Sequence, residues 1–392
     1  MATARAREPR ISSRLAPFGS TIFSDITRRA VESGAINLGQ GFPNFDGPDF
    51  VKEAAIAAIR AGHGQYAPSA GIPELASAIA ARFSAASGLA GIEPRDHVTV
   101  TSGCTEALAA TFIGLLEPGD GVILIEPTYD AYPVGLAMAG AVPGLVTLRP
   151  PAFELSMSDL EAAVSDRTKA IVVNTPHNPT GRVFTMTEME AIAGLCRRHD
   201  LVAITDEVYE HMVYDGRHIS LAGMPGMWER TVTLSSLGKT FSLTGWKVGW
   251  AVAPPHLTAG IRAAHQFLTF ATATPLQHAA AVALGASQSY FDHLSAGYRV
   301  KRDLLAEGLD AIGLEVFIPQ GTYFMMADHS SLGFGDDVAF VNHLIEAVGV
   351  AAIPPSAFYH DKSEARDLVR FAFCKDEETL REAIGRLGRL RA

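Results

Sequence analysis

Between about residues 96 and 250, short apolar runs rich in β-branched residues alternate with amphipathic stretches. The amphipathic stretches, of which 105–116 and 186–199 are the clearest, repeat apolar residues at helical spacing. The apolar runs predict strands at residues 97–101, 121–125, 170–174, 202–205, 232–235 and 248–252. Because the runs are continuously apolar, the sheet is expected to be buried on both faces. The pattern predicts an α/β fold with a mainly parallel sheet, whose ligands bind at the carboxyl ends of the strands.

The pattern changes after about residue 285. A long helical stretch at 290–312 leads into expected strands at 314–317, 322–327 and 369–373 and a closing amphipathic helix at 377–390. This order predicts a smaller α+β domain. The expected organisation is an N-terminal arm and part of the small domain at 1–45, a large domain at 46–285, and a C-terminal small domain at 286–392.

Length, charge and cysteine content limit the classes of function that this chain can have. The 392 residues suffice for a large domain and a smaller companion. The net charge of −10 argues against a nucleic-acid or membrane partner, since both select clustered Lys and Arg. Cys104, Cys196 and Cys374 have no metal-ligand spacing, so free thiols and no metal are expected. Residues 1–10 lack the apolar stretch of a signal peptide, and no run reaches the ~18–20 apolar residues of a membrane span. A cytoplasmic protein is expected.

A lysine follows directly after the strand expected at 232–235, in the segment Ser-Ser-Leu-Gly-Lys-Thr-Phe-Ser. Its Gly-Lys-Thr triplet suggests a nucleotide-binding P-loop, but that motif requires glycine at position 233, which is Thr233 here. Lys239 can instead form an imine with an aldehyde cofactor if its surroundings depress the pKa of the amine. Ser236 and Lys247 could then bind a phosphate by hydrogen bond and charge. The alternative is a surface turn with one solvated lysine.

Two other strand ends carry backbone or amide donors. After the first strand come Gly103, Cys104 and Thr105, where the start of a helix either offers free N–H groups to an anion or is an ordinary helix cap. The strand at 170–174 runs into Asn-Thr-Pro-His-Asn-Pro-Thr-Gly, whose prolines fix an irregular loop containing Asn178. This loop can aim its amides at a ligand or be a structural turn.

Charged groups end two more strands. Asp206 follows a buried strand, where a carboxylate could meet a ring nitrogen and keep it protonated, or could cap the next helix. Tyr209 lies three residues further on and could reach an oxygen beside the imine. Arg370 lies in an apolar strand of the smaller domain, where it requires either a bound carboxylate or an internal salt bridge.

Lys239, Asp206, the Asn-Pro-Thr-Gly loop and Arg370, in their order, resemble the fold-type-I pyridoxal-phosphate (PLP) aminotransferases of class I/II, over about residues 18–390. The segments 37–43, 65–66 and 238–242 resemble the kynurenine, glutamine–phenylpyruvate and methionine aminotransferases. Residues 20–23 and 204–211 are similar to succinyldiaminopimelate aminotransferases as well. The resemblance implies PLP transferase fold type I, with a mainly parallel seven-stranded sheet in the large domain. It also implies a PLP cofactor and a homodimer with active sites at the subunit interface.

The resemblance also implies residue roles in a ping-pong Schiff-base mechanism. Lys239 would be the imine lysine and the base that moves the proton, Asp206 would hold the ring nitrogen protonated, and Tyr209 would bond the phenolic oxygen. Tyr129 would cover the ring face, and Asn178 would also contact the cofactor. The phosphate would bind Tyr66 of a second subunit and five residues of this chain: Gly103, Cys104, Thr105, Ser236 and Lys247. The substrate α-carboxylate would bind Arg370, Asn178 and the backbone of Gly41.

The residue types expected near the site indicate the substrate preference. The segment 267–275 has no cation where aspartate-specific relatives place a second arginine. Phe23, Phe270 and Phe358 suggest an apolar rim for apolar, aromatic or glutamine-like L-amino acids, although each could be a core residue. Phe23 stands where some relatives have tryptophan, and Cys104 where many have a smaller residue.

The sequence leaves alternatives to this substrate class. The same rim could receive a pathway-specific amine such as N-succinyl-diaminopimelate or a specialised-metabolite precursor. The scaffold could also catalyse β-elimination from cysteine conjugates. A non-catalytic binding module of a DNA-binding regulator is disfavoured by the short N-terminal segment and the negative charge.

Overall fold

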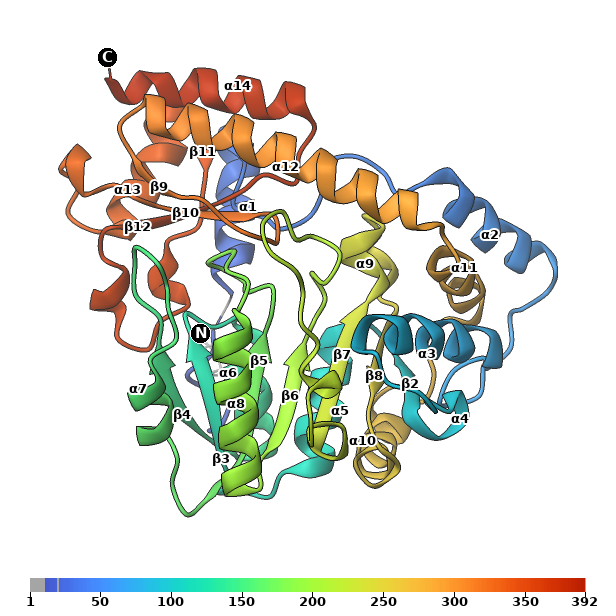
Figure 1. The fold of residues 1–392 in the computed structure, drawn as a ribbon. Helices are drawn as coiled ribbons and strands as arrows, with labels where there is room; N and C mark the ends of the chain where they lie inside the picture. The colour runs from blue at the N-terminus through green and yellow to red at the C-terminus, as the bar shows by residue number, and fades with distance from the viewer. Residues whose placement is uncertain (1–10, 20, 392) are drawn as a thin grey trace, which may run out of the picture.

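The computed structural model describes residues 11–19 and 21–391 (Figure 1). Residues 1–10, for which the sequence predicts no signal peptide, lie outside the described residues, as do Ser20 and Ala392. Within the described ranges, no helix combines the length and the apolar character that crossing a lipid bilayer requires.

The centre of the fold is a seven-stranded sheet with the order β2-β8-β7-β6-β5-β3-β4. Its strands are β2 (Val98–Thr101), β3 (Gly121–Glu126), β4 (Val142–Thr147), β5 (Thr168–Asn174), β6 (Val202–Asp206), β7 (Thr231–Ser236) and β8 (Gly249–Val252). All run parallel except β8, which is antiparallel to both of its neighbours, β2 and β7. The predicted fold class is therefore confirmed. The sequence pattern missed β4, an edge strand that contains Pro143 and Gly144 and is partly exposed.

Alternate residues of each strand face opposite sides of the sheet. Val122 and Leu124 pack in one core cluster, while Ile123 and Ile125 pack in another. The first cluster is covered by α5 (Cys104–Leu115), α6 (Ala131–Ala139) and α10 (Pro255–Leu268), and the second by α7 (Met157–Ala162) and α8 (Met186–His199). Figure 1 shows α8 lying in front of the sheet. The sheet is thus buried on both faces, which explains its continuously apolar strands.

A further group of helices packs at the β2 and β8 edge around Leu75, Ile79 and Trp250. It consists of α2 (Asp49–Arg60), α3 (Pro73–Ser87) and α11 (Thr274–Leu284). Two short helices connect to sheet strands: α4 (Pro94–His97) precedes β2, and α9 (Leu237–Thr240) follows β7.

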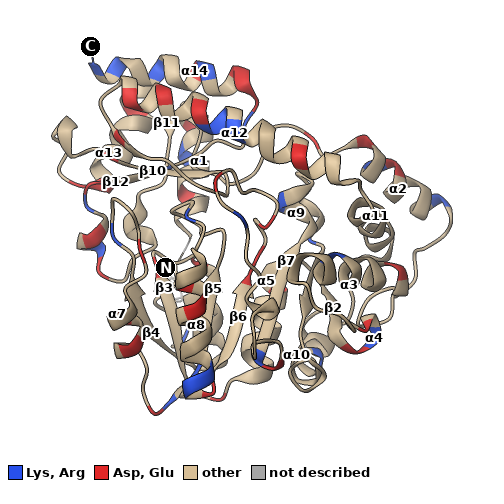
Figure 2. Cartoon of the chain, viewed as in Figure 1, with Lys and Arg blue, Asp and Glu red and all other residues tan. Residues whose placement is uncertain are grey.

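The second part of the molecule combines both ends of the chain. Its elements are α1 (Ile22–Ser33), β1 (Ile36–Asn37), α12 (Gln288–Ala311), β9 (Glu315–Phe317), β10 (Phe324–Asp328), α13 (Asp337–His343), β11 (Val350–Ala351), β12 (Leu368–Ala372) and α14 (Glu377–Leu387). Strands β12, β10 and β9 form an antiparallel sheet, and β1 pairs in parallel with β11. Helix α14 carries acidic residues in its first turn and a basic residue in its last (Figure 2).

The long helix α12 joins the two parts (Figure 1). Phe291, near its start, packs in the core around α2 and α3, whereas Leu305 and Leu309 pack with α1, β10 and β12. On this packing we propose the division already expected from the sequence: residues 1–45 and 286–392 with the small domain, and 46–285 as the large domain.

Candidate active site

A cavity of about 240 Å³ lies at the carboxyl ends of β2, β5, β6 and β7. This is the edge where ligands of parallel sheets bind. Thirteen of the residues expected from the sequence line it: Phe23, Gly41, Gly103, Cys104, Thr105, Tyr129, Asn178, Asp206, Tyr209, Ser236, Lys239, Lys247 and Arg370.

Lys239 lies on α9, immediately after β7. Its Nζ is 3.4 Å from the carbonyl oxygen of Gly41, and the ring centroids of Tyr209 and Tyr323 are 5.7 and 5.6 Å away. Among the described residues, no carboxylate forms an ion pair with this amine. Burial lowers the pKa of Lys239. A depressed pKa increases the fraction of neutral, nucleophilic amine, as imine formation requires.

Asp206 ends β6 and is buried. Its Oδ2 accepts a hydrogen bond of 2.9 Å from the hydroxyl of Tyr132, and its Oδ1 accepts one of 3.3 Å from the backbone N–H of Val208. Burial raises the pKa of Asp206, and these hydrogen bonds oppose that rise. A protonated ring nitrogen beside the carboxylate would favour its ionised form further. The sequence motifs did not single out Tyr132.

The two asparagines of the proline-rich loop form different hydrogen bonds. The side-chain oxygen of Asn174 accepts from the backbone N–H of Asn178 at 2.7 Å, and its amide donates to the Asp206 carbonyl at 2.9 Å. Asn174 therefore shapes the loop. The side-chain oxygen of Asn178 accepts a hydrogen bond of 3.0 Å from NH1 of Arg370. The loop is both a structural turn and part of the cavity lining.

Arg370, on β12, is 1% exposed, and its NH2 donates to the carbonyl oxygen of Gly39 at 2.9 Å. Its guanidinium lies 4.1 Å from the ring centroid of Phe324 and 4.8 Å from that of Phe358. Its Nε has no hydrogen-bond partner, and within the described part of the chain no carboxylate pairs with it. Burial lowers the pKa of Arg370 to about 10. The internal salt bridge considered from the sequence is absent there, so this cation is available to a bound carboxylate.

The junction from β2 to α5 has the geometry of an anion site. Gly103 has a φ of +82°, and a Cβ there would lie 3.0 Å from Cε and 3.1 Å from Nζ of Lys247. Glycine therefore lets this lysine approach the start of a twelve-residue helix, where the free backbone N–H groups of Cys104 and Thr105 favour an anion. Burial raises the pKa of the Cys104 thiol well above its usual value. The thiol stays neutral, so it does not oppose a phosphate.

These groups fit PLP. The cavity combines a buried amine at Lys239, a carboxylate at Asp206 and an anion site at Gly103 and Lys247, which match the aldehyde, ring nitrogen and phosphate of the cofactor. Tyr129 lines the same cavity, and its ring meets that of Tyr132 edge to face at 5.6 Å.

Three expected residues lie elsewhere. Tyr66 is 86% exposed and contacts Phe270 edge to face at 5.4 Å, outside the cavity of this chain. Phe358 is buried, with its ring centroid 4.8 Å from the Arg370 guanidinium, and does not line the cavity. Within one chain neither Phe270 nor Phe358 lines the cavity, so their part in an apolar rim stays a prediction. Phe324, which the sequence analysis did not single out, lines the cavity, because its ring packs on Arg370 from the neighbouring strand β10.

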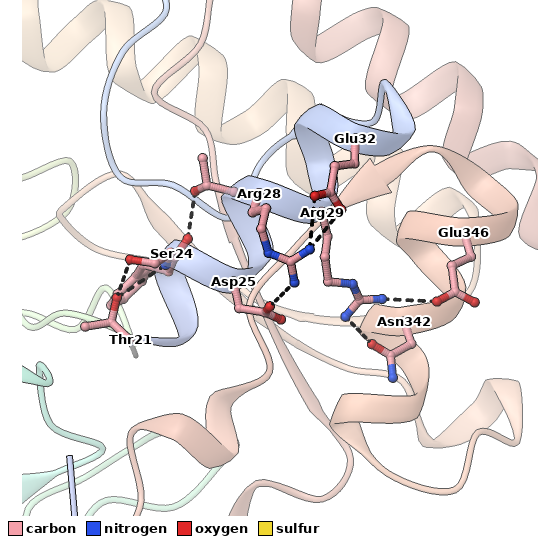
Figure 3. Close-up of polar contacts among 10 residues, drawn as sticks. Thr21, Ser24, Asp25, Arg28, Arg29, Glu32, Asn342 and Glu346 are labelled. Atoms are coloured by element: carbon pink, nitrogen blue, oxygen red, sulfur yellow. Dashed lines mark hydrogen bonds and ion pairs between the residues drawn. The ribbon is translucent and has the colours of Figure 1, made fainter. Parts of the chain in front are cut away.

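Helix α1 holds Phe23 at the cavity. Thr21 caps the helix by accepting from the backbone N–H of Ser24 at 3.3 Å. Figure 3 shows Arg29 reaching from α1 to Asn342 at 2.6 Å and to Glu346 at 3.1 Å. These contacts fasten the helix to the small domain.

Gln40 adds a contact on the cavity side, since its amide donates to the carbonyl oxygen of Phe23 at 2.9 Å. The ring of Phe23 lies 5.9 Å from that of Phe358. The position of Phe23 is therefore set by both α1 and the loop around Gly41.

Comparison with known proteins identifies close relatives. A family profile described as aminotransferase class I and II matches residues 33–387. The probable N-succinyldiaminopimelate aminotransferase of Mycobacterium tuberculosis is 48% identical over 386 residues, covering 96% of this chain and 97% of the relative. The methionine aminotransferase of Escherichia coli is 40% identical over 381 residues, covering 96% and 98%. A solved structure of N-succinyldiaminopimelate aminotransferase from M. tuberculosis superposes with a TM-score of 0.95 at 48% identity, over 97% of this chain and 100% of that one.

Proposed function

Because the chain belongs to the class I and II aminotransferase family and is a PLP-dependent aminotransferase, we propose that its amino donors are L-amino acids with apolar, aromatic or glutamine-like side chains. The enzyme transfers the amino group of an amino acid to a 2-oxo acid.

The number of cations around the cavity supports this substrate class. In the described part of the chain, the lining cations are Lys239, Lys247 and Arg370. We assign them to the cofactor aldehyde, the cofactor phosphate and the substrate α-carboxylate, so none remains for an acidic substrate side chain. Phe23 and Phe324 give the cavity an apolar side near Arg370. An apolar or neutral side chain avoids the cost of burying an unpaired charge there.

When bound, PLP supplies an aldehyde that captures amines and a ring that takes up electrons from the substrate carbon. We propose that Lys239 holds the cofactor and, when its amine is free, carries the proton to and from that carbon. Asp206 would hold the ring nitrogen protonated. Tyr209 and Asn178 would bond the phenolic oxygen, and Tyr129 would cover the ring face.

We propose that the remaining lining residues bind the two anionic ends. The backbone of Gly103, Cys104 and Thr105, with Ser236 and Lys247, would hold the phosphate. Arg370 and Asn178, with the backbone of Gly41, would hold the substrate carboxylate, because the guanidinium already has Asn178 beside it and no acidic partner in the described chain.

The role of Lys239 is tested by Lys239→Ala. The variant is expected to lose the visible absorbance of lysine-bound PLP and at least ~10³-fold of its activity, since it lacks both the attachment point and the proton carrier. Lys247→Ala is the comparison, because it removes a neighbouring cation but should keep the absorbance at saturating PLP. A Lys239→Ala variant with parental absorbance and turnover would reject the assignment.

The substrate proposal is tested by a donor panel of methionine, phenylalanine, kynurenine, glutamine and aspartate, with 2-oxoglutarate and pyruvate as acceptors. Aspartate is expected to have the lowest kcat/KM. N-Succinyl-diaminopimelate belongs in the panel, because a relative with 48% identity carries that name. A kcat/KM for this amine at least ~100-fold above the others would replace our proposal with that second candidate. Pyruvate and ammonia released from a cysteine conjugate, with no oxo acid present, would indicate β-lyase activity.

We also propose a homodimer in which Tyr66 completes the partner's phosphate site. Tyr66, Phe267, Leu268 and Phe270 are exposed and apolar, which is typical of a surface that a second subunit covers. Mixing inactive Lys239→Ala protomers with weakened Tyr66→Phe protomers should restore parental PLP affinity to one site per mixed dimer. No restoration, or a monomeric mass in solution, would refute the shared site.

The compartment proposed for the enzyme is the cytoplasm. Cys104, Cys196 and Cys374 are free, as thiols in a reducing compartment would be. Cell fractionation with a tagged chain tests this, and enrichment outside the cytoplasm would contradict it.

A further inference from the structure

Tyr132 connects the two groups expected to hold the edge and the face of the cofactor ring. It lies in the first turn of α6 and is 3% exposed. Its hydroxyl donates to Oδ2 of Asp206 at 2.9 Å, and its ring meets that of Tyr129 edge to face, with centroids 5.6 Å apart. One buried side chain therefore contacts both groups.

Of the hydrogen bonds that the Asp206 carboxylate accepts from a hydroxyl and from a backbone N–H, the one from Tyr132 is the better formed. The bond from the backbone N–H of Val208 is 3.3 Å long, beyond the usual range for N–H to O contacts, whereas 2.9 Å is close to the ordinary value for a hydroxyl donor. A donor to a carboxylate favours its ionised form and restricts its rotation. The Tyr132 hydroxyl is therefore the stronger of these two constraints on the orientation of the Asp206 carboxylate.

We propose that Tyr132 is a positioning residue for the cofactor ring: its hydroxyl keeps Asp206 oriented and ionised against the ring nitrogen, and its ring supports Tyr129. This inference rests on the proposed roles of Asp206 and Tyr129. Phenylalanine at position 132 would keep the aromatic contact and remove only the donor.

The groups around Asp206 determine whether removing the Tyr132 hydroxyl raises or lowers the pKa of this carboxylate. The titratable groups facing it are Cys104 from α5, Tyr129 from the segment after β3, Tyr132 from α6, Tyr209 from the turn after β6 and Lys239 from α9. Without the Tyr132 hydroxyl, the carboxylate becomes more basic and takes a larger share of the proton between it and the ring nitrogen.

Less positive charge then remains at that edge of the ring. With PLP bound, the nitrogen of Lys239 would therefore keep its own proton to a higher pH. A substitution at position 132 is thus expected to move a titration that is observed at Lys239.

The test uses the holoenzyme and its Tyr132→Phe variant. The pH midpoint of the visible absorbance change is expected to rise by about one pH unit. The Kd of the apoenzyme for PLP is expected to rise about tenfold, which is near the low end of the range for one hydrogen bond to a charged group. The kcat should fall more than KM changes. Tyr359→Phe is the control, because it removes a buried hydroxyl that donates to Leu148 at 3.2 Å outside the cavity. It should leave the midpoint and the Kd unchanged.

A double-mutant cycle separates this role from general packing. In an Asp206→Asn background, adding Tyr132→Phe is expected to change the PLP Kd by less than about twofold, because the carboxylate on which it acts is gone. A parental midpoint and Kd in Tyr132→Phe, or an undiminished effect in the Asp206→Asn background, would overturn the inference. A parent chain that takes up no PLP would refute the proposed function instead.

Discussion

Replacing Arg370 by lysine tests how the enzyme recognises amino acids. The guanidinium donates to Asn178 and to the Gly39 carbonyl, stacks on Phe324, and keeps Nε without a partner. An arriving α-carboxylate can use the planar fork, which lysine lacks while keeping the charge. A hydrogen bond to a charged group contributes about 1.5–3 kcal/mol. Losing one such bond and the fork geometry should cost about 2–3 kcal/mol, or about 30- to 150-fold in kcat/KM.

The assay compares L-phenylalanine with 2-phenylethylamine, the same molecule without its carboxylate. Single-turnover absorbance changes give kcat/KM for both substrates in the parent and in Arg370→Lys. The variant should lose the predicted factor with phenylalanine and stay within about twofold of the parent with the amine. Equal losses with both substrates would show that the substitution disturbs the site generally, and the recognition argument would fail.

Two other predictions concern stability and cofactor affinity. Burial raises the pKa of Glu210 from 4.5 to about 7, so the folded chain holds a proton that the unfolded chain has released, and the free energy of unfolding falls as pH rises from 4.5 to 7. In the Glu210→Gln variant the side-chain carbonyl can still accept from Ser235, but the titrating carboxyl is gone. Urea unfolding at pH 5 and pH 8 should therefore show a decrease in the free energy of unfolding that is smaller than the parent's by on the order of 2 kcal/mol. A decrease equal to the parent's would contradict the raised pKa of Glu210. Gly103→Ala adds a methyl 3.0 Å from Lys247 Cε at a φ of +82°, so the PLP Kd should rise about tenfold or more in a fluorescence titration. Gly88→Ala, with φ +74° and open space around its Cβ, should bind PLP like the parent, and equal affinities in both variants would disprove the steric argument.

Local pattern predicted most of the central sheet. Six of its strands lie within two residues of the expected ranges, and α8 spans Met186–His199 as expected. That helix has a complete local signal, because Thr185 and Glu188 form a capping box before its apolar positions. Strand β4 lacks such a signal, since an edge strand needs neither an unbroken apolar run nor a donor at every residue. The antiparallel direction of β8 is not encoded locally either, because the side-chain period of a strand is the same in both directions.

The sequence by itself determined where the groups proposed to carry the chemistry lie in the chain, because Lys239, Asp206, Asn178 and Arg370 each follow or lie on a recognisable strand or loop. Only the tertiary structure decided which side chains support them. Tyr132 meets Asp206 across 74 positions of the chain.

The same holds for the phenylalanines around Arg370. Phe324 lines the cavity because β10 pairs with β12, while Phe270 lies outside it beside Tyr66 and Phe358 is buried beside the guanidinium. Strand ends converge wherever a parallel sheet forms, so their residues can be placed from the sequence alone. Contacts between side chains depend on packing between elements that are distant in the chain, and a phenylalanine in the core has the same local pattern as one at a ligand site.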